Sequence, residues 1–297
     1  MPDNLYPDFV SYAQLTDRQL LSISGADAVT FAHAQFSADV AALADGHWLW
    51  SAWLSPKGRT LAVFQLLRVS AQELLLILAD GDADEIASQL RRFVFRRKAT
   101  ITLRTDLQVQ SAFKAPAQAS GAVIAGALTF DGTDGAELEL DMGGAALPRT
   151  LRIVAAAPPA ASDAASDAAF IEAWRAADLR FGLPRLVPSQ REQWTPQQLG
   201  LDRLNAYSVK KGCYPGQEIV ARTHFLGKAK RAVQLLELDA PCEPGASVQQ
   251  ADAALGTVVS TAGRLALAVL PLESDQGAVS VSGQPARRVP LIEGLAR

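Results

Sequence analysis

The chain has 297 residues, a formal net charge of −3 and 20% charged residues. A single hydrophobic core seldom grows beyond about 250 residues, so this length predicts two or three compact units. The small net charge argues against general nucleic-acid binding and against binding to an anionic membrane. No stretch reaches the roughly 20 apolar residues that a membrane span needs, and residues 1–7 do not resemble a secretory signal. We therefore expect a cytoplasmic protein without a membrane partner.

The sequence contains two cysteines, Cys213 and Cys242. Neither has a second cysteine or a histidine at the spacing of a metal site, so we predict no permanent zinc or iron–sulfur centre. Cys242 lies in a turn-like stretch rich in proline and glycine, where nothing nearby would activate its thiol. We interpret Cys242 as incidental to function.

The first hundred residues alternate between helical and strand patterns. Apolar periodicity predicts helices over 28–36 and 84–93, with a helical continuation over 39–44. Ser24 or Asp27 is expected to cap the first helix. Runs rich in aromatic and branched residues predict strands over 47–54, 59–68, 73–79 and 98–103. This order is typical of an α+β unit on an antiparallel sheet, which we assign to residues 1–104.

The rest of the chain predicts two further units. Short strand-like runs at 122–130, 136–140 and 151–155 indicate a second small α+β unit, assigned to residues 105–230. Ser162 or Ser166 is expected to cap its helix, which carries Phe170, Ile171, Trp174 and Ala177 on its apolar face and ends at Gly182. In residues 231–297, apolar runs at 233–238, 255–260, 265–270 and 278–281 predict a small antiparallel β-barrel.

Residues 210–231 contain more candidate functional residues than any other stretch. Gly212 and Gly216 allow a tight turn around Cys213, and Pro215 suits the first turn of a helix predicted over 217–225. The helix dipole and the ammonium groups of Lys210 and Lys211 would favour thiolate over thiol. Cys213 and Lys211 are therefore the candidate catalytic residues. The alternative is that Cys213 is a small buried residue, since free cysteine packs like a hydrophobe.

The run Lys211-Gly212-Cys213-Tyr214-x-Gly216-Gln217-Glu218, with Arg222, Gly227 and Arg231 after it, resembles the signature of the YgfZ family. These folate-binding proteins are related to the glycine cleavage T-protein, an aminomethyltransferase. The segments 180–184 and 194–202 extend the resemblance, and residues 25–40 and 54–59 match more loosely. The resemblance implies a T-protein-like arrangement of two α+β units and a barrel around a central cavity. It also implies tetrahydrofolate, or a derivative of it, as the cofactor.

The resemblance places the signature at the wall of the folate cavity. It predicts cofactor-binding residues at Gly212, Tyr214, Gly216, Gln217, Glu218 and Arg222. Gln217 and Glu218 either cap the helix or meet the pterin ring, whose aminopyrimidinone edge needs paired donors and acceptors. Lys211 and Arg222 either bind the glutamate carboxylate of folate or pair with local acids.

The biological role implied by the resemblance is support for the assembly or repair of iron–sulfur proteins. The expected partners are folate and iron–sulfur proteins or their assembly factors, with radical enzymes that modify tRNA among the clients. The alternative is a folate-dependent aminomethyl or one-carbon transferase. The T-protein family carries a catalytic acid on the strand after the turn at 55–58, whereas no Asp or Glu occurs between Arg59 and Gln72.

The basic run at residues 91–98 supports a third hypothesis, an RNA-binding accessory factor. We favour a structural interpretation, because cations complement the dipole at the end of the preceding helix. His224 is the histidine nearest to the signature in sequence, and we interpret it as a surface or core polar residue rather than a catalytic base.

Overall fold

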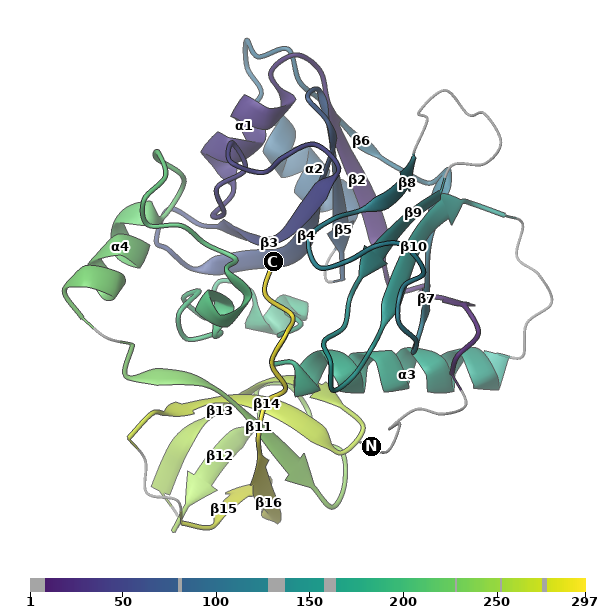
Figure 1. Cartoon of the computed structure of the whole chain (residues 1–297). Coiled ribbons are helices and arrows are strands. Elements are labelled where there is room, and N and C mark those ends of the chain that lie inside the picture. The colour runs from purple at the N-terminus through teal and green to yellow at the C-terminus, as the bar shows by residue number, and fades with distance from the viewer. Residues whose placement is uncertain are drawn as a thin grey trace.

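The computed structural model describes residues 9–79, 82–127, 137–157, 164–227, 229–251, 253–273 and 277–297. These residues form two five-stranded antiparallel sheets and a closed six-stranded barrel, which surround a central region (Figure 1). The predicted α+β class with a terminal antiparallel barrel is confirmed. Among the residues described, no helix is long and apolar enough to cross a membrane.

The first sheet has the strand order β3-β4-β5-β2-β6. Its strands are β2 (Gln19–Ser24), β3 (His47–Leu54), β4 (Thr60–Ser70), β5 (Glu73–Leu78) and β6 (Thr100–Leu103). Helices α1 (Ala28–Gln35) and α2 (Ala83–Arg91) cover one face, where Phe31, Phe64 and Leu76 are buried together. The opposite face turns Trp50 and Val63 toward the centre of the molecule. Both helices and all four predicted strands of this unit are confirmed.

One local prediction in this unit is wrong, and a second is confirmed only in the position of the cap residue. Residues 39–44 form turns instead of a helix, because the Asp39 carboxylate accepts the Ala42 N–H at 3.2 Å and so offers the backbone an alternative bond. Asp27 is the N-cap residue of α1, but its side chain makes no cap hydrogen bond, since it accepts the Lys98 N–H at 2.6 Å. Ser24 is the last residue of β2 and does not cap the helix.

The second sheet has the order β1-β7-β10-β9-β8. Its strands are β1 (Ala13–Gln14), β7 (Leu107–Ala112), β8 (Ala125–Ala127), β9 (Glu137–Asp141) and β10 (Thr150–Ala155). The sequence pattern missed β7. Residues 128–136, which include the end of one predicted run, lie outside the described residues. Because β1 pairs with β7, the chain contributes to this sheet before it builds the first one. The predicted boundaries at 104 and 230 stay predictions.

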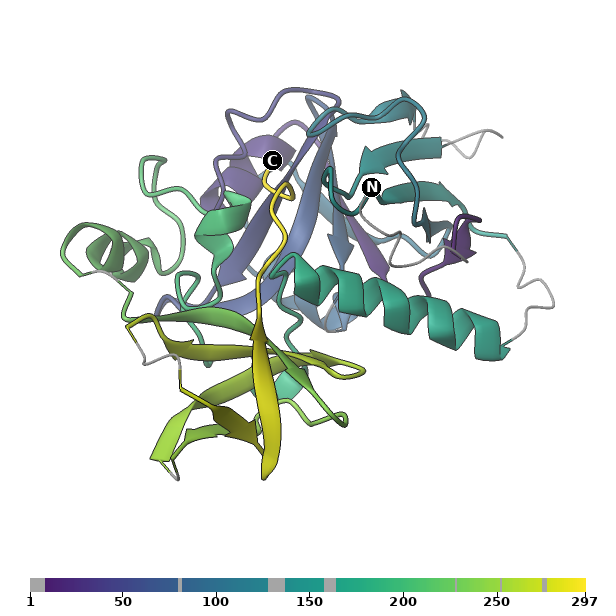
Figure 2. The same ribbon diagram turned by 60° about the horizontal axis from the view of Figure 1, so that its bottom comes forward.

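Helix α3 (Ala164–Arg180) packs against both the second sheet and the barrel (Figure 2). On the predicted apolar face, Phe170, Trp174 and Ala177 are buried and Ile171 is partly buried against the same core. Gly182, with φ of +72°, ends the helical path. Ser162 and the side chain of Ser166, the two predicted caps, lie outside the described residues.

The barrel consists of β11 (Arg231–Leu238), β12 (Ser247–Gln250), β13 (Ala253–Ala262), β14 (Leu265–Pro271), β15 (Val279–Val281) and β16 (Gln284–Val289). The four predicted apolar runs lie in β11, β13, β14 and β15. Strands β12 and β16 were not predicted, because glutamine and arginine on their exposed faces leave no run of apolar residues.

The segment after β16 runs back between the two sheets, where the C-terminal end of the ribbon lies (Figures 1 and 2). Trp50 donates its indole N–H to the carbonyl oxygen of Leu295 at 2.9 Å, and both side chains are buried. The Arg297 guanidinium lies 5.2 Å from the centre of the Trp48 ring. The C-terminal segment therefore fills part of the central region between the sheets.

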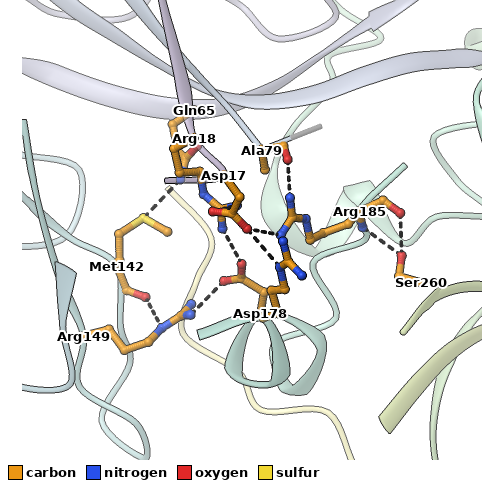
Figure 3. Close-up of polar contacts among 10 residues, drawn as sticks. Asp17, Arg18, Gln65, Ala79, Met142, Arg149, Asp178, Arg185 and Ser260 are labelled. Carbon is orange, nitrogen blue, oxygen red and sulfur yellow. Dashed lines mark hydrogen bonds and ion pairs between the residues drawn. The ribbon is translucent and has the colours of Figure 1, made fainter. Parts of the chain in front are cut away.

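A buried ionic network also joins the units (Figure 3). The Asp178 carboxylate on α3 accepts hydrogen bonds from Arg149 at 2.7 Å and from Arg18 at 2.9 Å. Asp17 accepts from Arg185 at 2.6 Å, while the Ser260 hydroxyl on β13 donates to the Arg185 carbonyl at 2.7 Å. Because buried charges need partners, this network fixes the two sheets, α3 and the barrel relative to one another.

Candidate functional site

The signature leads into helix α4 (Gln217–Phe225), whose bounds match the predicted helix. Its N-cap is Gly216, with φ of +76°, a left-handed conformation that only glycine adopts without strain. Pro215 therefore precedes the cap and does not occupy the first helical turn, which corrects the sequence prediction. The loop containing Cys213 is irregular and lies before this turn.

Gly216 packs directly on the turn between β3 and β4. A Cβ at Gly216 would lie 2.6 Å from both the Cα of Gly58 and the carbonyl oxygen of Ser55. A Cβ at Gly58 would in turn lie 2.7 Å from the Cβ of Ile219 on α4. The two glycines therefore permit a backbone contact that places the start of α4 against the first sheet.

Lys211 points away from solvent and closes the end of α1. Its Nζ donates to the carbonyl oxygens of His33 and Phe36 at 2.5 Å and of Ala38 at 3.0 Å. Burial lowers the pKa of Lys211 to about 8, although nearby Asp39 opposes the shift. The ammonium thus neutralises carbonyl dipoles at a helix C-terminus. In this geometry Lys211, which the sequence paired with Cys213, stabilises the end of α1.

Tyr214 and Gln217 hold the loop in place. The Tyr214 hydroxyl donates to the Ser208 carbonyl at 3.0 Å, its ring lies 4.7 Å from the Lys211 Nζ, and burial raises the pKa of Tyr214. Gln217 donates its side-chain amide to the Lys211 carbonyl at 2.8 Å. These contacts make the loop around Cys213 a fixed structure rather than a free turn.

The remaining signature residues face solvent. Cys213, Gly212, Glu218 and Arg222 are all exposed, which excludes the alternative of Cys213 as a buried packing residue. Cys242, by contrast, is half-buried, and burial together with Glu243 raises the pKa of its thiol. Cys213 is therefore the accessible thiol of the two.

His33 lies beside the signature loop, which the sequence did not indicate. Its Nε2 is 3.9 Å from the position of a Cβ at Gly212, and its Nδ1 accepts the Ala41 N–H at 3.2 Å. Burial and the charge of Lys211 lower the pKa of His33. Because His33 comes from α1, far away in the chain, only the fold brings it here. His224 instead lines a pocket beside α4.

That pocket, which we call the α4 pocket, has a volume of about 440 Å³ and lies between α4, the turn Leu201–Leu204 and the barrel. Its lining includes Gln197, Asp202, Tyr207, Thr223, His224, Val233 and Leu272. Gln197 donates its side-chain amide to the Val220 carbonyl at 2.9 Å, whereas its buried Oε1 has no hydrogen-bond partner among the described residues. Burial and the charge of Asp202 raise the pKa of Tyr207 to about 12.

A second depression of about 270 Å³ adjoins the α4 pocket and shares Thr223 and Ala229 with it. Its lining carries three cationic side chains, Arg59, Lys230 and Arg231. The combined surface therefore has a partly apolar half, which contains one buried acceptor without a partner, and a basic half. An anionic ligand with a donor-bearing ring would match both halves.

Tetrahydrofolate fits this description. The pterin edge offers N–H donors, which the Gln197 Oε1 and the Asp202 carboxylate can accept, and the glutamate carboxylates match the basic half. A volume of this size lies within the range of roughly 300–1,000 Å³ typical of small-molecule sites. In the described part of the chain, no group of three or more His, Cys, Asp or Glu side chains could hold a metal ion.

Known structures show which class of fold this is. The chain matches the glycine cleavage system aminomethyltransferase T of Bartonella henselae with a TM-score of 0.70 at 15% identity, over 94% of this chain and 84% of that one. The protein therefore has the T-protein fold, as the sequence predicted.

Curated relatives narrow the class. The chain is 28% identical over 243 residues to the tRNA-modifying protein YgfZ of Colwellia psychrerythraea, covering 74% of this chain and 69% of the relative. It is 29% identical over 246 residues to the tRNA-modifying protein YgfZ of an Enterobacter species, and the match covers 78% of this chain and 73% of the relative. No family model matches the chain. The chain is thus a distant homologue of the YgfZ tRNA-modifying proteins with a T-protein fold.

Proposed function

We propose that this protein binds tetrahydrofolate and supports the assembly or repair of iron–sulfur proteins, including enzymes that modify tRNA. The observation that carries the proposal is an exposed Cys213 on the fixed loop that leads into α4, together with a folate-compatible pocket that Thr223 and His224 of the same helix line. The homologues named tRNA-modifying proteins support the link to tRNA.

In the proposed complex, Gln197 and Asp202 accept hydrogen bonds from the pterin, and Lys230 and Arg231 bind the glutamate carboxylates. Arg222, next to Thr223 on α4, is a further proposed ligand of the glutamate. The other signature residues would influence the cofactor indirectly, because they position α4: Gly212, Tyr214, Gly216, Gln217 and Glu218. The carboxylate of Glu218 is also stabilised by the helix dipole. Bound tetrahydrofolate would supply a carrier for one-carbon groups.

Cys213 is proposed to act transiently, as a nucleophile or as a passing ligand of a cluster on its way to a client. An exposed thiol on a rigid loop suits either task, because the client protein can reach the sulfur without rearrangement of the loop. Cys213→Ser should leave folate binding unchanged and fail to restore iron–sulfur enzyme activity in a deletion strain. Full restoration would remove the thiol from the mechanism.

Titration calorimetry with tetrahydrofolate tests the cofactor proposal. We expect binding by the wild type, a loss of about ten-fold or more in Lys230→Glu, and little change in Arg264→Glu, a barrel residue away from the pocket lining. Gln197→Leu should also weaken binding, because it removes the unpaired acceptor. Absence of binding by the wild type would end the folate proposal and leave the role of Cys213 to be judged by complementation.

The rival function is folate-dependent aminomethyl transfer, which the T-protein fold brings into consideration. On β4, the side chains turned toward the central region include Val63, Gln65 and Leu67, none of which is a carboxylate. A transferase of T-protein type would need an acid there. Turnover of an aminomethyl donor by the pure protein with tetrahydrofolate would favour the rival.

A further inference from the structure

The depression of about 270 Å³ beside the α4 pocket, which we call the basic depression, gathers cations from separate parts of the chain. Arg59 comes from the turn between β3 and β4, Lys230 from the residues that follow α4, and Arg231 from the start of β11. Within the described part of the chain, the lining contains no Asp or Glu. Because the protein as a whole has a net charge of −3, this local excess of positive charge is a property of the depression and not of the surface in general.

The three cations are accessible to a ligand. Lys230 and Arg231 are exposed and Arg59 is half-buried, and none of them forms an ion pair with another described residue. Each guanidinium is held from one side, since the Nη1 of Arg59 donates to the Gln193 carbonyl at 2.8 Å and that of Arg231 to the Leu255 carbonyl at 2.6 Å. A guanidinium carries five N–H donors, so both arginines keep donors for an incoming anion.

The amide in the lining does not compete for these donors. The Gln198 Oε1 accepts the Thr195 N–H at 3.0 Å and lies 3.5 Å from the Nη1 of Arg59. Its acceptor is therefore already used within the protein. A ligand in the basic depression meets cations without a competing carboxylate, which favours carboxylate or phosphate groups.

The basic depression continues from the α4 pocket, because Thr223 and Ala229 line both. A ligand seated in the pocket can therefore extend into the depression. Tetrahydrofolate with one glutamate ends in two carboxylates, and the proposed complex uses Lys230 and Arg231 to bind them. Arg59 is then left without a carboxylate. Each further glutamate, joined through the γ-carboxyl group of the one before, adds one carboxylate along the same chain.

We propose that this site selects polyglutamylated tetrahydrofolate, with the first glutamate on Lys230 and Arg231 and a following one on Arg59. The inference rests on the proposed function, since the pterin has to occupy the α4 pocket for its tail to reach the basic depression. A polyglutamate tail is favoured over a free polyphosphate, because a group tethered to a bound ring meets the cations at a high effective concentration.

Titration calorimetry with tetrahydrofolate that carries one or three glutamates tests the inference. At roughly 20 mM salt we expect the triglutamate to bind about five-fold more tightly, and at roughly 300 mM salt we expect the ratio to fall toward one, because exposed ion pairs are screened. Arg59→Gln should reduce the ratio at low salt to less than about two-fold and leave the affinity for the monoglutamate within about two-fold of wild type. That unchanged affinity also shows that the variant folds.

Lys57→Gln is the matched control, because Lys57 is an exposed cation on the same turn but outside the lining. It should keep the wild-type ratio. A ratio that Arg59→Gln leaves intact, or that Lys57→Gln also lowers, would overturn the role of Arg59. Equal loss of both ligands in Arg59→Gln would do the same, since Arg59 would then not be specific for the longer tail.

The wild-type titrations separate this inference from the folate proposal. If the monoglutamate binds as tightly as the triglutamate, selection for polyglutamate is overturned and the folate proposal stands. If neither ligand binds, both are overturned. Inorganic tripolyphosphate provides the remaining comparison. If it binds as tightly as the triglutamate at equal ionic strength, the basic depression is a phosphate site and the inference is overturned.

Discussion

The backbones of Gly216 and Gly58 are in direct contact, so close that a Cβ on Gly216 would lie 2.6 Å from the Cα of Gly58. This contact joins the cap of α4 to the turn between β3 and β4. The loop that carries Cys213 is consequently fixed to the first sheet at one end and to α1, through Lys211, at the other.

Gly216→Ala should destabilise the protein. The φ of +76° strains any residue with a Cβ, at a cost of about 1–3 kcal/mol, and the contact with Gly58 adds steric repulsion. Urea unfolding measures the change in the free energy of unfolding. Gly212→Ala is the control, because the nearest atom to its new Cβ is the His33 Nε2 at an ordinary 3.9 Å. Equal losses in the two variants would contradict the assigned role of Gly216.

Lys211→Met should lower stability without changing the reactivity of Cys213. Removal of the ammonium leaves the carbonyl oxygens of His33, Phe36 and Ala38 without their donor, at a cost of about 1–3 kcal/mol or more. We expect the rate of Cys213 alkylation by iodoacetamide to stay within about two-fold of wild type, measured where the variant is folded.

Lys210→Met is the matched control, because Lys210 is exposed on the same loop. Its stability should stay within about 0.5 kcal/mol of wild type. If Lys211→Met instead lowered the alkylation rate strongly and left stability unchanged, the result would support the hypothesis that Lys211 activates the Cys213 thiol.

Local patterns in the sequence predicted the elements well. The bounds of α4 follow from Gly216 and the run after it, and the strands of the first sheet follow from their aromatic and branched residues. The signature also led to the T-protein fold. The roles of individual residues could not be predicted from the sequence, because each role depends on contacts with residues that are distant in the chain. Nothing near Lys211 in sequence indicates the carbonyls of α1, and nothing near Gly212 indicates His33.

Stability should fall between pH 4 and pH 2 in a manner that depends on Asp17. Burial alone would raise the pKa of Asp17, but Arg18 and Arg185 outweigh it and lower the pKa to about 2 from an ordinary 3.8. The folded state thus binds the proton less readily than the unfolded state. The stabilisation is complete above about pH 4 and is lost as the pH falls toward 2, with a total of roughly 2 kcal/mol.

Urea midpoints recorded from pH 7 to pH 2 measure this dependence. Asp17→Asn should be less stable at pH 7 and should show a flatter profile below pH 4, because it cannot titrate. A variant profile as steep as that of wild type would assign the acid sensitivity to other carboxylates.

Deletion of residues 293–297 should destabilise the protein and expose the central tryptophans. Leu295 is buried, and its burial is worth about 1.5–3 kcal/mol. The deletion also removes the acceptor of the Trp50 indole N–H, and a hydrogen bond that water can replace contributes about 0.5–1.5 kcal/mol. We expect a lower urea midpoint and a red shift of tryptophan fluorescence, since Trp48 and Trp50 would gain contact with water. Arg297→Ala alone should cost less, because it keeps Leu295 in place. If the deletion changed neither the midpoint nor the emission maximum, this segment would not pack in the central region in solution.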